Sequence, residues 1–94
     1  MENEYVVNHI INSFINSKKN TFQDIFLYVK RFVWIDKVIL QKALRRAIKS
    51  KLVSKNDNKK YFTKSTIFTL TDEGKVVLKD NIYYNARTIQ DGLF

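Results

Sequence analysis

Residues 36–50 read DKVILQKALRRAIKS and carry basic side chains at a spacing that suits binding to a polyanion. At 100° per residue, Lys42, Arg45, Arg46 and Lys49 share one face of a helix, and the segment places no carboxylate on that face. Like charges four residues apart repel each other by about 0.2–0.5 kcal/mol per pair. A solvated helix usually interleaves the two signs, so a helix that keeps this repulsion is expected to have an anionic partner.

Double-stranded DNA is the partner that this face predicts. The major groove admits one α-helix, where Arg can bond bidentately to guanine and Gln to adenine. The remaining cations can neutralise phosphates. The candidate contacts on this helix are Lys37, Val38, Gln41, Lys42, Arg45, Arg46 and Lys49.

A second basic segment follows the helix and mixes cations with aromatic side chains. This composition suits the backbone and sugars of a nucleic acid. We expect Phe62 to pack in the core rather than to contact a ligand. The candidate contacts in this segment are Lys55, Asn56, Asn58, Lys59, Lys60, Tyr61 and Lys64.

The net charge of +8 is concentrated in the middle of the chain. Residues 30–64 hold twelve basic and two acidic residues, a balance of +10, whereas the rest of the chain carries −2. Such concentration is the electrostatic footprint of a nucleic-acid binder. A plain solvated basic surface is the alternative that composition leaves open.

The sequence shows no constellation suited to catalysis. The absence of Cys excludes disulfides, thiol nucleophiles and Cys-based zinc sites. The single histidine, His9, is expected on the polar surface of a helix. The carboxylates of Asp24, Asp36, Asp72 and Glu73 are each explained by a position at a helix start. We therefore expect neither enzyme activity nor a metal or cofactor.

Hydrophobic periodicity predicts one α+β domain over residues 1–94. Thr21, Asp36 and Thr71 are the expected N-caps. The expected elements are a bundle of three helices at about 3–17, 21–32 and 36–50, a two-stranded β-hairpin at about 52–70, and a C-terminal helix at about 72–89. The expected core faces are Val7, Ile10, Ile11 and Phe14 in the first helix, Phe22, Ile25, Phe26, Val29 and Phe32 in the second, and Leu40, Ala43, Leu44, Ala47 and Ile48 in the third.

No apolar run approaches the roughly 20 residues that span a bilayer, and the N-terminal MENEYVVNHI is polar and acidic. We therefore expect a soluble protein without a membrane partner. Its expected compartment is the cytoplasm, or the nucleus if the source is eukaryotic.

The segments IDKVILQKALRRAIKSKLV and FTLTDEGKVVL resemble the winged helix-turn-helix family, over about residues 5–80. The second is similar to the strand-to-helix junction of MarR- and PadR-type regulators, where Leu-Thr, an acidic residue and Gly precede a terminal helix. Small viral and archaeal winged-helix proteins are similar in length and in their Lys- and Asn-rich composition. The resemblance implies a third helix in the major groove, a wing on the flanking backbone or minor groove, and a homodimer formed through terminal helices. The matching candidates for a dimer interface are Leu78, Ile82, Ala86 and Ile89.

The segments YVKRF and LQKALRRAIKSKLV are also similar to linker-histone globular domains, although the Gly-rich wing of that family is absent. Three function classes therefore stay open: a sequence-specific transcription regulator, a non-specific architectural DNA binder, and a winged-helix module for protein or RNA contact. A regulator that reads two half-sites one helical turn apart requires a dimer, whereas an architectural binder can act as a monomer.

Overall fold

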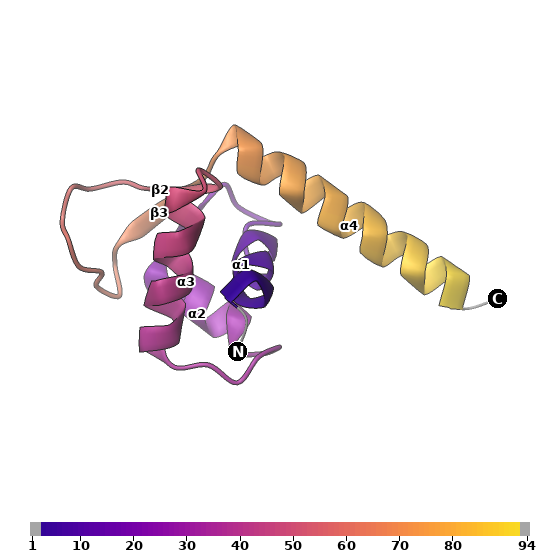
Figure 1. Cartoon of the computed structure of the whole chain (residues 1–94), viewed down its shortest axis with the longest axis horizontal. Coiled ribbons are helices and arrows are strands. Elements are labelled where there is room, and N and C mark those ends of the chain that lie inside the picture. The colour runs from indigo at the N-terminus through magenta and orange to yellow at the C-terminus, as the bar shows by residue number, and fades with distance from the viewer. Residues whose placement is uncertain (1–2, 93–94) are drawn as a thin grey trace.

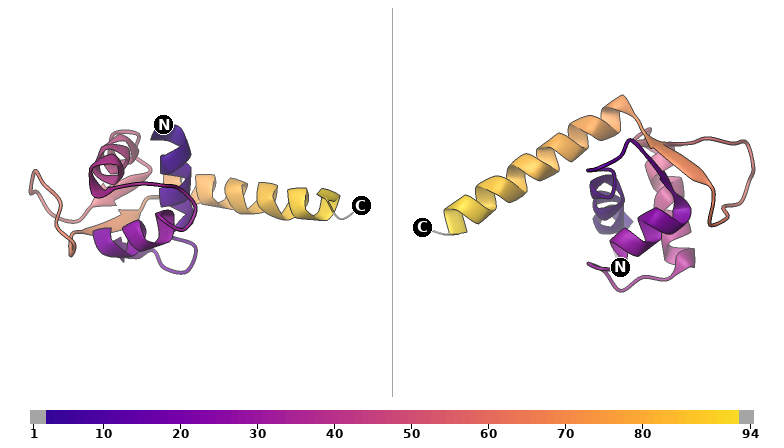
Figure 2. Two further views of the ribbon diagram at one scale, coloured as in Figure 1. Left: turned by 90° about the horizontal axis from the view of Figure 1, so that it is seen from below. Right: turned by 180° about the vertical axis from the view of Figure 1, so that it is seen from behind.

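The computed structural model describes residues 3–92, with side chains described for residues 4–82. The helices are α1 (Asn3–Asn12), α2 (Phe22–Val29), α3 (Lys37–Lys49) and α4 (Asp72–Gly92), and the strands are β1 (Lys19–Thr21), β2 (Val53–Lys55) and β3 (Ile67–Leu70). Helices α1 to α3 form a compact body beside the strands (Figure 1). The loop between β2 and β3 extends from one side of this body, and α4 projects from the other side (Figure 2). We call residues 56–66, which form that loop, the wing.

One hydrophobic core joins the three helices to the sheet. Ile10 of α1, Ile25 of α2 and Leu44 of α3 are fully buried, as the periodicity predicted. Ala43 and Ala47 of α3 are also fully buried, and α1 packs against α3. Small side chains at these two positions leave room for a neighbouring element to approach α3 closely.

Side-chain caps fix the starts of α2 and α3, as predicted. The Thr21 hydroxyl accepts the backbone N–H of Asp24 at 3.1 Å, and the Asp24 carboxylate accepts that of Thr21 at 3.4 Å, which completes a capping box. The Asp36 carboxylate accepts the backbone N–H of Ile39 at 2.8 Å. Each cap satisfies N–H groups that have no partner inside the helix.

A left-handed residue turns the chain from α3 into β2. Lys51 has a φ of 63°, and its N–H donates to the Ile48 carbonyl at 3.0 Å. The N–H of Leu52 donates to the Ala47 carbonyl, also at 3.0 Å, which completes a Schellman motif. Glycine is the usual residue at this position, and a side chain there costs about 1–2 kcal/mol.

The predicted hairpin is present as the antiparallel pair of β2 and β3, and β1 adds a third strand to it that the sequence did not predict. The order of the strands is β1-β3-β2 with both pairs antiparallel, and Phe68 of the central strand aligns with Asn20 on one side and Lys55 on the other. The sequence KNT of β1 shows neither β-branched enrichment nor an apolar alternation that predicts a strand. It becomes a strand because β3 offers it a free edge.

Two helices end earlier than predicted. Helix α1 stops at Asn12 rather than near residue 17, and the Ser13 hydroxyl donates to the Ile10 carbonyl at 2.5 Å. Such local side-chain bonds compete with helix continuation. Helix α2 stops at Val29 rather than near residue 32, so Phe32 lies outside the buried stripe and is exposed.

The start of α4 is held against the end of α3. The Thr71 hydroxyl donates to the Lys51 carbonyl at 2.6 Å and accepts the N–H of Gly74 at 3.0 Å, so Thr71 acts as the predicted N-cap. A Cβ at Gly74 would lie 2.1 Å from the Leu52 carbonyl oxygen and 2.6 Å from Leu70 Cδ1. Only glycine fits this approach between backbones.

The first turns of α4 pack on the body, and the helix then continues past it. Val77 and Leu78 lie against the core, and the Asn81 amide donates to the Asn12 side chain at 2.9 Å. Val76 and Ile82 are exposed. Within the residues described, no helix, α4 included, combines the length and the apolar character that a bilayer crossing requires.

Replacing Gly74 by Ala is expected to lower the free energy of unfolding by about 2 kcal/mol or more, because the new methyl group meets the Leu52 carbonyl. Helix propensity alone predicts the opposite sign, since Ala is favoured over Gly by about 1 kcal/mol. Urea unfolding measures the difference. Val76→Ala, which removes an exposed side chain on the same helix, should change stability by less than about 0.5 kcal/mol. A more stable Gly74→Ala protein would contradict the close approach.

Candidate nucleic-acid interface

The outward face of α3 carries the residues predicted to contact a DNA groove. Lys42 and Lys49 are exposed, and within the described part of the chain their side chains make no hydrogen bond or ion pair. Lys37 and Val38 are exposed near the helix start, and Gln41 is half-buried on the flank. The free cations on this face can therefore accept phosphate or base partners without first breaking an internal contact.

Arg45 connects α3 to the wing. One guanidinium N–H donates to the Lys60 carbonyl at 2.8 Å, and the guanidinium carbon lies 4.7 Å from the centre of the Phe62 ring. The second contact is a cation–π interaction, worth about 0.5–1 kcal/mol at an exposed site. Arg45 thus fixes the position of the wing relative to α3, a role that helical periodicity did not indicate.

Arg46 lies at the edge of the face, next to α1. Its guanidinium pairs with the Glu4 carboxylate at 3.2 Å, which comes from α1 because the α3 segment itself places no carboxylate on this face. Glu4 is 42 residues away and only the fold brings it here. Both side chains are more than half exposed, and an exposed pair contributes about 0–1 kcal/mol. A phosphate can therefore replace Glu4 at small cost.

Lys55 holds the base of the wing together. Its ammonium donates to the Asp57 carboxylate and to the carbonyl oxygens of Asp57 and Lys59, and its side chain is only 13% exposed. The Asp57 carboxylate also accepts the backbone N–H of Lys59 at 2.9 Å. The hydrogen bond from Lys55, followed by that N–H, lowers the pKa of Asp57. Lys55 was predicted to contact DNA, but the structure places its charge inside the wing.

Phe62 anchors the returning arm of the wing in the core, as expected. It is 8% exposed, and its ring meets the Phe68 ring edge-to-face at 5.3 Å and lies 6.1 Å from the Phe22 ring. The backbone N–H of Phe22 donates to the Thr66 carbonyl at 2.8 Å. The arm is thus attached to the start of α2 as well as to β3.

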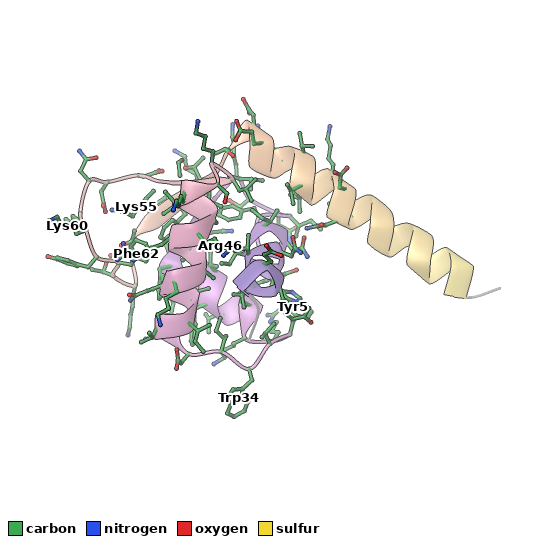
Figure 3. The ribbon with its side chains drawn as sticks, in the orientation of Figure 1. Tyr5, Trp34, Arg46, Lys55, Lys60 and Phe62 are labelled. Carbon is green, nitrogen blue, oxygen red and sulfur yellow. The ribbon has the colours of Figure 1, made fainter. Side chains whose placement is uncertain are left out.

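The remaining wing candidates are exposed. Figure 3 shows Lys60 at the outer end of the loop. Asn56 continues the strand pairing, since its N–H donates to the Ile67 carbonyl at 2.9 Å. The side chains that face solvent are those of Asn56, Asn58, Lys59, Lys60, Tyr61 and Lys64.

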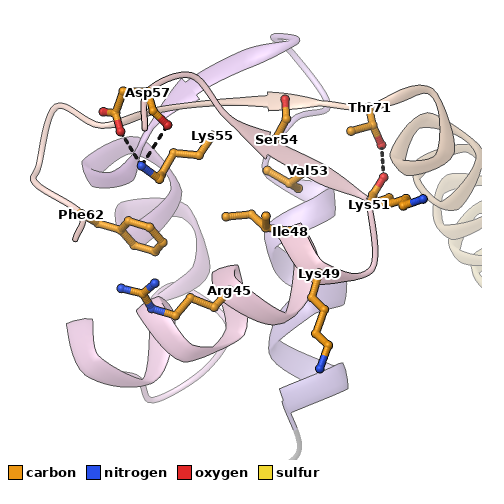
Figure 4. Close-up of a pocket in the computed structure, with 10 residues that line it drawn as sticks. All are labelled: Arg45, Ile48, Lys49, Lys51, Val53, Ser54, Lys55, Asp57, Phe62 and Thr71. Atoms are coloured by element: carbon orange, nitrogen blue, oxygen red, sulfur yellow. Dashed lines mark hydrogen bonds and ion pairs between the residues drawn. The ribbon is translucent and has the colours of Figure 1, made fainter. Parts of the chain in front are cut away.

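A groove of about 620 Å³ separates α3 from the wing (Figure 4). Ile48, Val53 and Phe62 give it an apolar floor, and Arg45 and Lys49 stand on the α3 side. Apolar atoms suit the sugar of a nucleic-acid backbone, and the cations suit its phosphates. The arrangement can therefore seat one strand of a duplex between helix and wing.

His9 is part of an aromatic cluster rather than an isolated surface histidine. Its ring stacks on Phe32 at 5.3 Å and meets the edge of Tyr5 at 4.8 Å. Partial burial lowers the pKa of His9 and favours the neutral ring. Among the described residues no three His, Asp or Glu side chains gather into a possible metal site.

Trp34 is an exposed residue that the sequence reasoning did not single out. It lies in the turn between α2 and α3, in the run VWI, where an apolar side chain is expected to be buried. The sequence feature that could have marked Trp34 as a candidate is its position two residues before the cap Asp36, among the basic residues Lys30, Arg31 and Lys37.

The dimer candidates lie on α4. Leu78 is half-buried against the core and Ile82 is exposed. Ala86 and Ile89 lie outside the residues whose side chains are described. Of the four positions, Ile82 is therefore the one shown to be open to a partner.

The sequence matches no protein-family model and no curated protein. Solved structures do share its fold. BpsR from Bordetella bronchiseptica, whose DNA binding is regulated by 6-hydroxynicotinic acid, gives a TM-score of 0.70 over 92% of this chain at 13% identity. The zinc-responsive MarR family member ZitR from Lactococcus lactis gives 0.69 over 93% at 16% identity. A PadR family transcription regulator from Clostridium difficile gives 0.63 over 94% at 18% identity.

These neighbours are winged-helix transcription regulators of the MarR and PadR families, so the predicted fold is confirmed. The chain spans 61% of the length of BpsR and 57% of ZitR, but 98% of the PadR family regulator. At these identities the likeness establishes a shared fold and not a shared ligand.

Replacing Lys55 by Met is expected to raise the pKa of Asp57 towards its ordinary value, because the main hydrogen bond to the carboxylate is lost. In the unchanged protein, the stabilisation from this pair is present above the ordinary Asp pKa and is lost as pH falls through the lower folded-state value. An NMR titration of the Asp57 carboxyl carbon measures both midpoints. Lys60→Met, which leaves the contact intact, should not move the midpoint. Equal midpoints for Lys55→Met and the unchanged protein would contradict the assigned role.

Proposed function

We propose that this protein binds double-stranded DNA and acts as a sequence-specific transcription regulator inside the cell. The observation that carries the proposal is the face of α3 with Lys42 and Lys49 free, beside a basic wing. Structures with the same fold are transcription regulators, which supports a regulatory role and a protein that is not an enzyme.

In this proposal α3 enters the major groove and the wing lies on the flanking backbone. Gln41 carries the amide that can read adenine, and Val38 suits the methyl group of thymine. Lys42 and Lys49 bind phosphates on either side of the groove. On the wing, Lys59, Lys60, Tyr61 and Lys64 contact sugar and phosphate.

A non-specific architectural DNA binder is the main alternative, and a module for protein or RNA contact is the second. Selection of bound sequences from a random DNA pool separates the first two. A motif with two symmetric half-sites supports the regulator, whereas enrichment without a motif supports the architectural binder. A pool that yields no bound duplex would exclude both DNA-binding functions and favour the module for protein or RNA contact.

The double replacement of Lys42 and Lys49 by Gln should weaken binding to duplex DNA and reduce the slope of log affinity against log salt by about 2, because each phosphate contact contributes about 0.9. Fluorescence anisotropy over a salt series measures the slope, and urea unfolding should show unchanged stability. The matched control replaces Lys75 and Lys79 of α4 by Gln, with the same change in charge but on the helix that projects away from the wing. An unaltered slope in the α3 variant would refute the proposed placement of α3.

We also propose a homodimer formed through α4, with Leu78, Ile82, Ala86 and Ile89 at the interface. Ile82→Asp should then convert a dimer into a monomer at micromolar concentration, because it buries an unpaired charge. Sedimentation velocity measures the mass. The control is Val76→Asp, an exposed position about 1.7 turns earlier on the same helix. An unchanged protein that sediments as a monomer contradicts the dimer.

A further inference from the structure

We infer that Trp34 is a further DNA-contacting residue, whose indole packs against the duplex beyond the N-terminal end of α3. The inference rests on the proposed DNA binding and extends its surface from α3 and the wing to the turn between α2 and α3. The ligand chemistry is that of a nucleic-acid duplex, with a sugar face for the indole and phosphates for the neighbouring cations.

The exposure of Trp34 is the first observation. At 95% it is the most exposed large hydrophobic side chain among the described residues. Figure 3 shows the indole beyond the N-terminal end of α3, pointing away from the body of the protein. A protein gains nothing in stability from an indole left in water, so a binding role accounts for it better than a packing role.

The turn that presents Trp34 is well anchored. Val33 before it is 7% exposed, and its N–H donates to the Val29 carbonyl at 3.1 Å. Ile35 after it packs against the core, and Asp36 caps α3. Because both neighbours are held inward, the outward direction of Trp34 follows from the local structure.

Basic residues flank Trp34 on both sides of the turn. Lys30 lines a pocket together with Trp34, and the ammonium groups of Lys30 and Lys37 lie 5.7 and 5.8 Å from the centre of the Phe26 ring. Asp36 is the only acidic residue between positions 25 and 56, and its carboxylate is engaged by a backbone N–H of α3. The electrostatic environment of Trp34 is therefore suited to a polyanion.

A shallow pocket beside Trp34 offers a place for the duplex. Its volume is about 260 Å³, and Lys30, Val33, Trp34 and Ile35 line it. Three of the four lining residues carry apolar or aromatic side chains and the fourth is Lys30, which suits a sugar next to a phosphate. The core of a protein–protein interface is depleted in charged residues, so Lys30 beside this indole favours DNA over a protein partner.

Trp34 is the single tryptophan of the chain, so its fluorescence reports on this position alone. Two quantities are measured with a duplex of mixed sequence at low salt, which is labelled with fluorescein for the first and unlabelled for the second. The first is the anisotropy of the label, which reports DNA binding by the unchanged protein and by Trp34→Ala. The second is quenching of Trp34 by the neutral molecule acrylamide, with and without unlabelled duplex. Ile15→Ala, which removes another exposed apolar side chain outside this region, is the control for anisotropy.

The expected result is that the duplex lowers acrylamide quenching several-fold and that Trp34→Ala weakens binding by about five- to thirtyfold, because the buried indole is lost, with Ile15→Ala unchanged. If the duplex binds but quenching or the affinity of Trp34→Ala is unaffected, the contact is refuted while the proposed function stands. If no duplex binds, both the proposed function and the contact of Trp34 with DNA are refuted. A change in sedimentation of Trp34→Ala together with unchanged DNA affinity would assign the indole to self-association instead and overturn the inference.

Discussion

The burial of Phe62 is the interaction on which the geometry of the candidate interface depends. Its ring is buried against Phe68 of the central strand, and the guanidinium of Arg45 lies over it. One aromatic side chain therefore joins the wing, the sheet and α3. Without it the wing would be a long loop between two short strands, and a two-stranded hairpin alone is only marginally stable in water. The basic residues of the wing keep a defined position beside α3 because Phe62 is held in the core.

The cations of this region divide into two groups by what they contact. Lys55 and Arg45 donate to backbone carbonyls of the wing, and Lys55 also pairs with Asp57. These two charges determine the shape of the surface. Lys42 and Lys49 have no such contacts among the described residues, so their charges are free to act on a ligand. A count of basic residues treats all four alike, whereas the structure separates those that build the surface from those available to bind.

Much of the fold could be predicted from residues that are close together in the sequence. Most of the features that the sequence did not predict depend on contacts between residues far apart in the chain. The caps at Thr21 and Asp36 and the buried face of α3 could be predicted, because each depends on residues within about one turn of helix. Strand β1 could not, since its sequence is polar and its pairing with β3 exists only in the folded chain. The same limit applies to the interface. The outward face of α3 follows from its periodicity, but the contact of Arg46 with Glu4 depends on how distant segments are placed. The exposure of Trp34 depends on the packing of Val33 and Ile35 on the core, which the run VWI does not reveal.

The junction at Thr71 and Gly74 brings the beginning of α4 into direct contact with the end of α3, although β2, the wing and β3 lie between the two helices in the chain. Helix α4 then extends well past the body (Figure 1). In a dimer held through α4, this helix would act as a lever arm, and a small change in its angle at the junction would become a large displacement between the two copies of α3. Half-sites on DNA are about 34–36 Å apart when two such helices bind successive turns of the major groove. The tight contact that excludes a side chain at position 74 would then keep the angle between α3 and α4 constant and so determine the distance between the two copies of α3.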